Sequence, residues 1–209
     1  MVKKKGHCRY YTLVEIMTVI VIAAILLGIA IPAFTTMIQG NSMTVAIRQL
    51  SAKIQAARAY AIANRCRVAV LLLTNEDGIK DDFRYSAYRV CVVNSSNAFQ
   101  EWIEDENWKN LPRGILRHSA MSGTGNVTGI DASDIGNASS SALTVPAVIF
   151  KENGQFADIA SQATINLCQG RYVGSAIYTE RSSNGNPVKH PIVINQYSGK
   201  VSVENISDT

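Results

Sequence analysis

Histidine and cysteine are scarce in this sequence, and neither type is grouped in the way that metal or redox sites require. The three histidines, His7, His118 and His190, stand far apart and show no metal-ligand spacing. The cysteines include no C-x-x-C pair, which argues against a zinc knuckle or a thioredoxin-like centre; they are Cys8, Cys66, Cys91 and Cys168. One disulfide among the last three would need an oxidising compartment, and buried free thiols are the alternative. We therefore expect no metal and no cofactor.

Catalytic signatures are also absent. The sequence contains no nucleophile elbow, zincin motif, P-loop or dinucleotide fingerprint. Asp81 and Asp82 are adjacent in sequence, so they do not face each other as an acid/base pair would. The acidic group at 104–106, near Trp102 and Trp108, suggests a calcium loop or a saccharide platform, but the EF-hand pattern is missing and a solvated loop beside packed aromatics is commoner. We expect no enzymatic activity and no small-molecule substrate.

Charged residues make up only 17% of the chain, with 20 Lys and Arg against 16 Asp and Glu. Four of the basic residues, Lys3, Lys4, Lys5 and Arg9, precede the first hydrophobic run. Without those four, the basic residues number the same as the 16 acidic ones. The remainder of the chain is therefore neutral overall, which argues against a nucleic-acid partner because such a partner favours a basic patch on the folded part.

One long hydrophobic run dominates the N-terminal region. The segment from Ile16 to Ile31 is almost unbroken, and from Thr12 to Phe34 it reaches the roughly 20 residues that span a bilayer. The basic flank lies before the run, and only Arg48 follows it closely, so the positive-inside rule predicts a cytoplasmic N-terminus and an exported remainder. A secretory signal peptide is the less favoured alternative, because the run is too long and no A-x-A site follows it. A plain signal anchor is the second alternative.

Glu15 is the one acid at the start of this run. A carboxylate at membrane depth costs several kcal/mol and usually marks a function or a partner. The alternative is that Glu15 lies at the cytoplasmic interface and contacts water.

Tyr11-Thr-Leu-Val-Glu15, followed by the apolar run and Pro32, resembles the prepilin signal of type IV pilins and pseudopilins. In that family an aromatic residue begins the mature chain, an acid is its fifth residue and a proline follows about five turns into the helix. Counting from Tyr11, Glu15 is fifth and Pro32 is twenty-second. The resemblance implies cleavage between Tyr10 and Tyr11 by a prepilin peptidase, N-methylation of Tyr11, and a Glu15 carboxylate that compensates a neighbour's N-terminal amine.

The leader departs from the family at one position. The prepilin peptidase requires glycine immediately before the cut, and this sequence has Tyr10 there. The nearest glycine, Gly6, would make Glu15 the ninth residue of the mature chain. The spacing of Tyr11, Glu15 and Pro32 therefore follows the family pattern, while the residue before the cleavage position departs from it.

The pattern after Pro32 predicts a continuing amphipathic helix to about Asn64. Its apolar positions recur every three or four residues and are Met43, Ile47, Leu50, Ile54, Ala57 and Ala61. The segment Gly40-Asn41-Ser42 could bend or interrupt the helix. The stripe is expected to pack on a sheet.

The period then changes to that of strands. The segments predicted as strands are Val68–Leu73, Tyr85–Val93, Ser141–Phe150, Thr164–Cys168, Tyr172–Thr179, Pro191–Gln196 and Lys200–Glu204. A stretch rich in Gly, Ser and Asn between Met121 and Ser141 is predicted as a loop.

Three later motifs refine the resemblance. The segment Leu50–Asn64, with Arg58 in an Ala-Arg pair, is similar to the region after the anchor in minor pseudopilins of the type II secretion H type and in FimT-like minor pilins. Asn153-Gly154 and Ser198-Gly199-Lys200-Val201 are similar to that group's final hairpin.

The expected fold class is α+β, pilin-like, with a long N-terminal helix packed on an antiparallel β-sheet. We expect a leader at 1–10, a transmembrane and assembly helix at 11–34, an amphipathic helix at 35–66 and an exported β-rich domain at 67–209. The resemblance implies a structural pseudopilin or minor pilin in the bacterial inner membrane, with its C-terminal domain in the periplasm. Through the N-terminal helix it would join other pilins, assembling into or priming a short fibre of a type II secretion or type IV pilus system.

Two alternatives come from other classes. A DNA-binding minor pilin for DNA uptake is disfavoured by the neutral exported part. A membrane-tethered binding protein or enzyme with a borrowed anchor is the other.

Overall fold

The computed structural model describes residues 12–75, 79–131, 133–136, 142–157, 162–174, 176–182 and 184–203. The predicted leader at 1–10 lies outside this description. The chain divides into two compact units, residues 1–41 and residues 42–209. We call the second unit the head domain.

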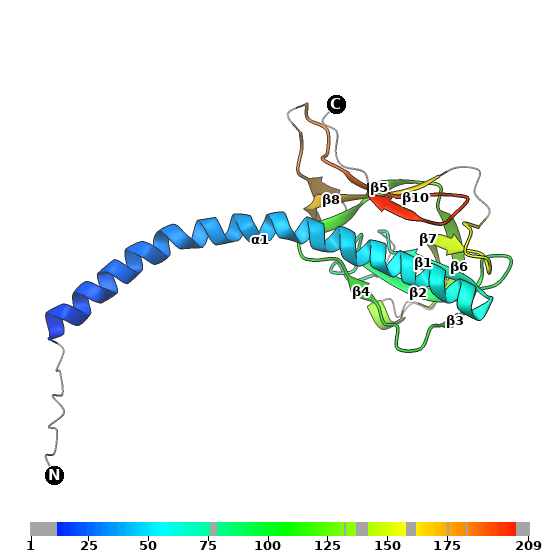
Figure 1. The fold of residues 1–209 in the computed structure, drawn as a ribbon, viewed down its shortest axis with the longest axis horizontal. Coiled ribbons are helices and arrows are strands. Elements are labelled where there is room, and N and C mark those ends of the chain that lie inside the picture. Colours follow the sequence, from blue (N-terminus) through cyan, green and yellow to red (C-terminus); the bar gives the residue numbers. More distant parts are fainter. Residues whose placement is uncertain are drawn as a thin grey trace, which may run out of the picture. The chain divides into compact units, whose positions relative to one another are not determined.

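A single helix, α1 (Leu13–Asn64), runs through 52 residues (Figure 1). It begins at a capped N-terminus, where the backbone N–H of Glu15 donates to Thr12 Oγ1 at 3.2 Å. It continues through residues 40–42, where the sequence left an interruption open. At the other end Arg65 adopts a positive φ of 51°, and the N–H of Cys66 donates to the carbonyl of Ala61 at 3.3 Å, which closes the last turn as in a Schellman motif.

The strands form two antiparallel sheets. The first has the order β3-β2-β1-β7-β6, with β4 pairing to β2, and is made of β1 (Arg67–Leu72), β2 (Ala87–Val93), β3 (Phe99–Trp102), β4 (Lys109–Asn110), β6 (Gly125–Ile130) and β7 (Leu143–Phe150). The second has the order β11-β10-β8-β5, with β9 pairing to β8, and is made of β5 (Ile115–Ser122), β8 (Ala163–Val173), β9 (Ala176–Thr179), β10 (His190–Ile194) and β11 (Val201–Val203). A bridge between Ala98 and Thr128 brings the two ends of the first sheet together.

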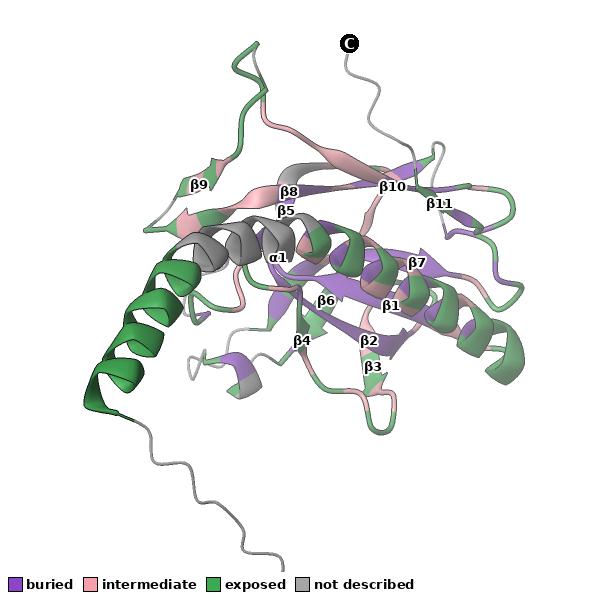
Figure 2. Ribbon diagram, turned by 60° about the vertical axis from the view of Figure 1, so that its left-hand side comes forward, coloured by how far each residue is buried: buried purple, intermediate pink, exposed green. Residues whose placement is uncertain are grey.

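The predicted helical stripe forms the centre of the main core. All of its positions are buried except Ile47, which is half-buried, and Ala46 joins them. They pack with side chains of both sheets, including Val70 of β1 and Ile165 of β8. Figure 2 shows this part of α1 lying over the buried strands β1, β2 and β7. The α+β architecture predicted from the sequence is confirmed.

Strand β1 is buried on both faces, which explains its unbroken apolar sequence. Val68, Val70 and Leu72 face the main core beneath α1. Ala69 and Leu71 face a second core, which the curled first sheet encloses together with Ile130, Ile135 and Val145 among others. A strand covered on both sides cannot alternate polar and apolar residues.

The prediction of a loop from Met121 to Ser141 was wrong in part. It contains strand β6 and a short 3-10 helix at Ser133–Ile135. In β6 only Val127 and Ile130 are buried, and the glycine and polar residues between them face outward. The predicted strand Tyr172–Thr179 is also corrected, because β8 ends at Val173, β9 begins at Ala176, and the two strands pair with each other in antiparallel fashion.

Candidate functional site

The predicted processing and assembly residues fall at the beginning of the chain. Tyr10 and Tyr11 lie outside the described residues. Glu15 is exposed in the first turn of α1, where its backbone N–H makes the Thr12 cap. Pro32 lies within α1, at a position where the structure describes no side chain. Cleavage, methylation and the assembly role of Glu15 therefore stay predictions.

The first turns of α1 expose many large apolar side chains. These are Leu13, Val14, Ile16, Met17, Val19, Ile20, Val21, Ile22, Ile25, Leu26 and Leu27, each between 47% and 75% exposed. Exposed apolar surface of this extent marks a region that contacts a partner or a lipid phase. Among the described residues, no helix has both the length and the apolarity needed to cross a membrane.

Arg58 joins the two hairpin motifs that the sequence singled out separately. Its Nε donates to the carbonyl oxygen of Gly154 at 3.0 Å, across 96 residues of sequence. Gly199 packs against the same carbonyl, because a Cβ there would lie 2.4 Å from Gly154 O and 2.9 Å from Arg58 Nε. Both glycines have positive φ, 77° and 63°. The helix, the turn after β7 and the turn before β11 therefore meet at one point of the head domain.

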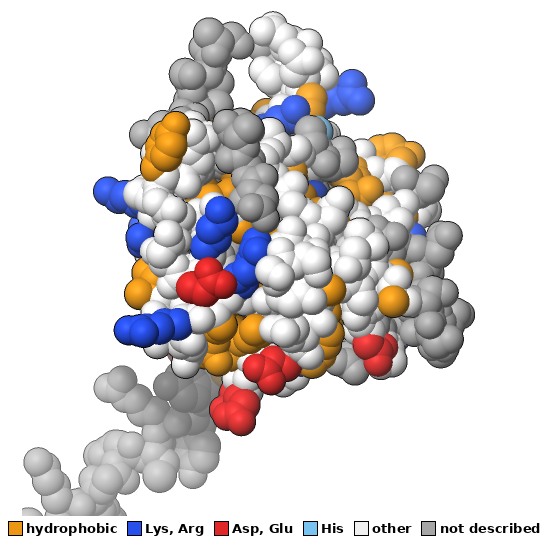
Figure 3. All heavy atoms as spheres, turned by 90° about the vertical axis from the view of Figure 1, so that its right-hand side faces the viewer, with side chains coloured by type: hydrophobic (Ala, Val, Ile, Leu, Met, Phe, Trp, Pro, Cys, Tyr) orange, Lys and Arg blue, Asp and Glu red, His pale blue; other side chains and the backbone are white. Residues whose placement is uncertain are grey.

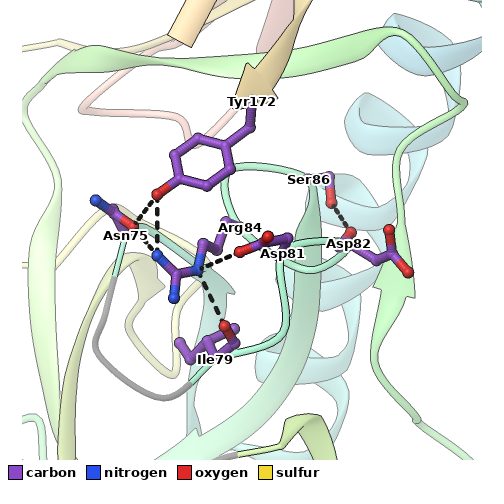
Figure 4. A network of polar contacts seen from close by, with 7 residues as sticks. All are labelled: Asn75, Ile79, Asp81, Asp82, Arg84, Ser86 and Tyr172. Carbon is purple, nitrogen blue, oxygen red and sulfur yellow. Dashed lines mark hydrogen bonds and ion pairs between the residues drawn. The ribbon is translucent and has the colours of Figure 1, made fainter. Parts of the chain in front are cut away.

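A network of polar contacts ties the segment before β2 to strand β8 (Figure 4). Arg84 Nε donates to the carbonyl of Ile79 at 3.0 Å and lies 3.3 Å from Asp81 Oδ1, and its Nη1 donates to the hydroxyl of Tyr172 at 2.9 Å. The Tyr172 hydroxyl donates in turn to Asn75 Oδ1 at 2.6 Å. This network spans the two sheets, so it fixes their relative position at one end of the head domain.

Arg117 is a second link between the sheets. Its side chain is buried in β5, and Nη2 donates to the carbonyl of Leu73, directly after β1, at 3.0 Å. Burial lowers the pKa of Arg117 to about 10, so the guanidinium is still charged at neutral pH. The Tyr85 ring, 5.6 Å from the guanidinium carbon, gives it a cation–π partner.

The tryptophans and one acid of the group at 104–106, Glu106, make contacts within the fold. The Arg89 guanidinium lies 3.7 Å from the centroid of the Trp102 ring and covers it. Trp102 packs on Trp108, with 5.9 Å between the ring centroids. Glu106 forms an ion pair with Lys53 of α1. Within the described part of the chain, no three His, Cys, Asp or Glu residues are grouped to hold a metal. A saccharide platform or calcium loop is not favoured by these contacts.

The three cysteines of the head domain are free thiols. Cys91 and Cys168 are buried, and burial raises the pKa of their thiols to about 12 and about 11. Such thiols stay protonated at neutral pH and are poor nucleophiles. Cys66 is half-buried, and desolvation raises its pKa as well. Cys8 lies outside the described residues.

Charged side chains are mixed on the face of the molecule shown in Figure 3. Lys and Arg gather toward one side of that face around an acidic side chain, and much of the rest is uncharged. On this face the basic side chains form no continuous stripe of the kind that tracks a nucleic-acid backbone.

No family model matches the chain, and no curated protein matches it. The structure is similar to two crystal structures of the type IV minor pilin FimU from Pseudomonas aeruginosa strain PAO1. Both have 15% sequence identity and a TM-score of 0.44; one alignment covers 79% of this chain and 90% of FimU, the other 78% and 92%. A likeness of this degree assigns neither a family nor a function to the chain.

Proposed function

We propose that this chain is a structural, non-enzymatic pseudopilin or minor pilin, anchored in the bacterial inner membrane, which joins or primes a short periplasmic fibre. The observation that carries the proposal is the register of Tyr11, Glu15 and Pro32. The prepilin pattern requires an aromatic residue, an acid, an apolar helix and a proline at fixed spacings. A sequence meets all of these conditions by chance only rarely.

The helix supports the proposal in its length and its exposed side chains. At 1.5 Å per residue, 52 residues extend about 80 Å. The part after Met43 is held in the head domain by the buried stripe, whereas Leu13 to Leu27 expose apolar side chains that nothing in the described chain covers. We infer that membrane lipid covers this segment before assembly, and the helices of neighbouring subunits afterwards.

Glu15 would fix the axial position of one subunit against the next. Its backbone N–H is used by the Thr12 cap, and the structure gives its carboxylate no hydrogen bond or ion pair with another described residue. A negative charge in the first turn of a helix interacts favourably with the helix dipole. In an apolar fibre core it needs a cation, and the N-terminal amine of a neighbour would supply one.

Replacing Glu15 by Ala is expected to abolish assembly while leaving the head domain folded. The carboxylate is the only acid in the apolar segment, so its loss leaves the neighbouring amine uncompensated. Disulfide or chemical crosslinking of the chain to partner pilins in the membrane, with and without the substitution, measures this. Glu152→Ala removes an exposed acid from the head domain and is the matched control. Normal assembly of Glu15→Ala would refute the proposal.

Processing is expected between Tyr10 and Tyr11, in a host whose peptidase accepts tyrosine before the cut. The spacing that makes Glu15 the fifth residue after a cut before Tyr11 serves no physical purpose in a chain that is not cut there. Mass spectrometry of the protein from its own host should find an N-terminus at Tyr11, with or without a methyl group. Tyr10→Gly should speed the cut, because glycine lets a peptidase approach the backbone closely. An intact leader in the host would contradict the cleavage and leave the chain as a single-pass membrane protein.

A further inference from the structure

A cleft of about 390 Å³ opens between the turn at 81–86, the segment that leads into β5 and the end of β8. Its lining includes the buried side chains of Leu111 and Ile115 and the half-buried ring of Tyr172. These apolar groups give the cleft a floor that suits an aliphatic or aromatic side chain. Arg84, which also lines the cleft, donates to the Tyr172 hydroxyl and so holds the ring in place (Figure 4).

Two arginines line the same cleft from adjoining backbone positions. The N–H of Gly170 donates to the carbonyl of Gly114 at 2.9 Å, and Arg113 and Arg171 are the residues directly before and after this bonded pair. Both are exposed, and neither guanidinium has a hydrogen bond or ion pair with any residue that the structure describes. Two like charges on adjoining backbone positions at one cleft favour an anion near them.

Two acidic residues line the same cleft. Asp81 is paired with Arg84, whereas Figure 4 shows the Asp82 carboxylate turned away from that guanidinium. Asp82 contributes its backbone carbonyl, which accepts from Ser86 Oγ at 2.6 Å, and its carboxylate has no partner among the described residues. The lining of the cleft therefore combines two arginines and an aspartate that have no partner among the described residues with apolar side chains.

We propose that this cleft binds an extended acidic peptide segment of a partner protein, with one carboxylate held between Arg113 and Arg171. Guanidinium groups bind carboxylates in a planar, two-bond arrangement that a pair of arginines can share. An apolar side chain next to the carboxylate would lie on Leu111 and Tyr172. A nucleic acid is disfavoured because its continuous line of phosphates would bring further negative charges near Asp81 and Asp82, whereas a single carboxylate needs to contact only the two arginines. The site belongs to the head domain alone, so it does not depend on the proposed function.

The test uses the full chain in neutral detergent micelles and a fluorescently labelled acetyl-Leu-Glu-Leu-Glu-amide peptide, followed by fluorescence anisotropy. Saturable binding is expected, and Arg171→Gln is expected to weaken it at least about tenfold, as for the loss of a charge-assisted hydrogen bond. Arg113→Gln should do the same and serves as the second variant. Arg181→Gln, an exposed arginine that does not line the cleft, is the control and should bind as the unchanged chain does.

A second readout separates a binding role from a structural one. Without peptide, Arg171→Gln should melt slightly higher than the unchanged chain at low salt, because it removes one of the two like charges at the cleft. With peptide, only the unchanged chain and Arg181→Gln should gain stability. Equal weakening by Arg181→Gln, equal binding of a Leu-Gln-Leu-Gln peptide, or equally strong displacement by inorganic phosphate or a single-stranded DNA oligonucleotide would each overturn the proposal. An absence of saturable binding would do so as well.

Discussion

Ile54→Asp is expected to unfold the head domain. Ile54 is fully buried at the centre of the helical stripe, where it packs among residues of both sheets. An ionised carboxylate placed there without a partner costs several kcal/mol, and a domain is ordinarily stable by only about 5–15 kcal/mol. The substitution therefore removes most or all of the stability of the fold.

The loss should be visible in the tryptophan fluorescence, because Trp102 and Trp108 pack at the edge of the first sheet. Urea unfolding of the full chain in micelles is the measurement. Gln55→Asp adds the same carboxylate at the next, exposed position of α1 and should leave the unfolding midpoint nearly unchanged. Equal urea midpoints for the two variants would mean that the apolar stripe of α1 is not buried against the sheets.

The spacing of apolar residues was sufficient to predict α1 and its buried face. An apolar stripe at helical period, with no proline between residues 33 and 64, predicts a helix strongly. Leu50, Ile54 and Ala61 of this stripe are buried as predicted. Strand β1 was predicted because a strand covered on both faces is apolar throughout. These elements are determined by local sequence together with burial.

Other strands were missed because their sequences do not follow a simple pattern. Strand β5 contains Arg117, which is buried, and His118, which is half-buried, so its apolar alternation is broken. Strand β3 has the sequence FQEW, and none of its residues is fully buried. These segments are strands because they pair with segments that are distant in the sequence. A local sequence pattern does not show such pairing.

The cleft residues could not have been identified from the sequence. Arg113 and Arg171 are 58 positions apart in the numbering, and they become neighbours only through the pairing of β5 with β8. The same holds for Arg58, Gly154 and Gly199, which the sequence marked as three separate weak motifs. Their contact supplies a physical reason for the glycines, since each is required by its φ and by its neighbours.

Gly199→Ala is expected to cost on the order of 3 kcal/mol. A side chain at a φ of 63° is strained by about 1–2 kcal/mol whatever surrounds it. In addition, the new Cβ would lie 2.4 Å from Gly154 O, so that carbonyl must move away from Arg58 Nε. A hydrogen bond to a charged group contributes about 1.5–3 kcal/mol, and the displacement weakens it.

The control is Gly185→Ala. Gly185 has a φ of 77°, but a Cβ there would meet nothing within 4 Å. The Gly185→Ala variant therefore has the backbone strain alone. The difference in unfolding free energy between the two variants isolates the contact of residue 199 with Gly154 and Arg58. In a chain of this size the larger loss corresponds to a fall in melting temperature of roughly 6–12 °C, against roughly 2–8 °C for the control.

A double-mutant cycle with Arg58→Ala completes the test. Once the guanidinium is gone, displacing the Gly154 carbonyl breaks no charged hydrogen bond, so Gly199→Ala should cost less in that background than in the unchanged chain. The measurement is urea unfolding of all four chains. Additive costs, or equal costs for Gly199→Ala and Gly185→Ala, would show that the helix and the two turns do not depend on one another. A coupling of about 1 kcal/mol or more would mean that Arg58 links the end of α1 to the last hairpin through a single carbonyl.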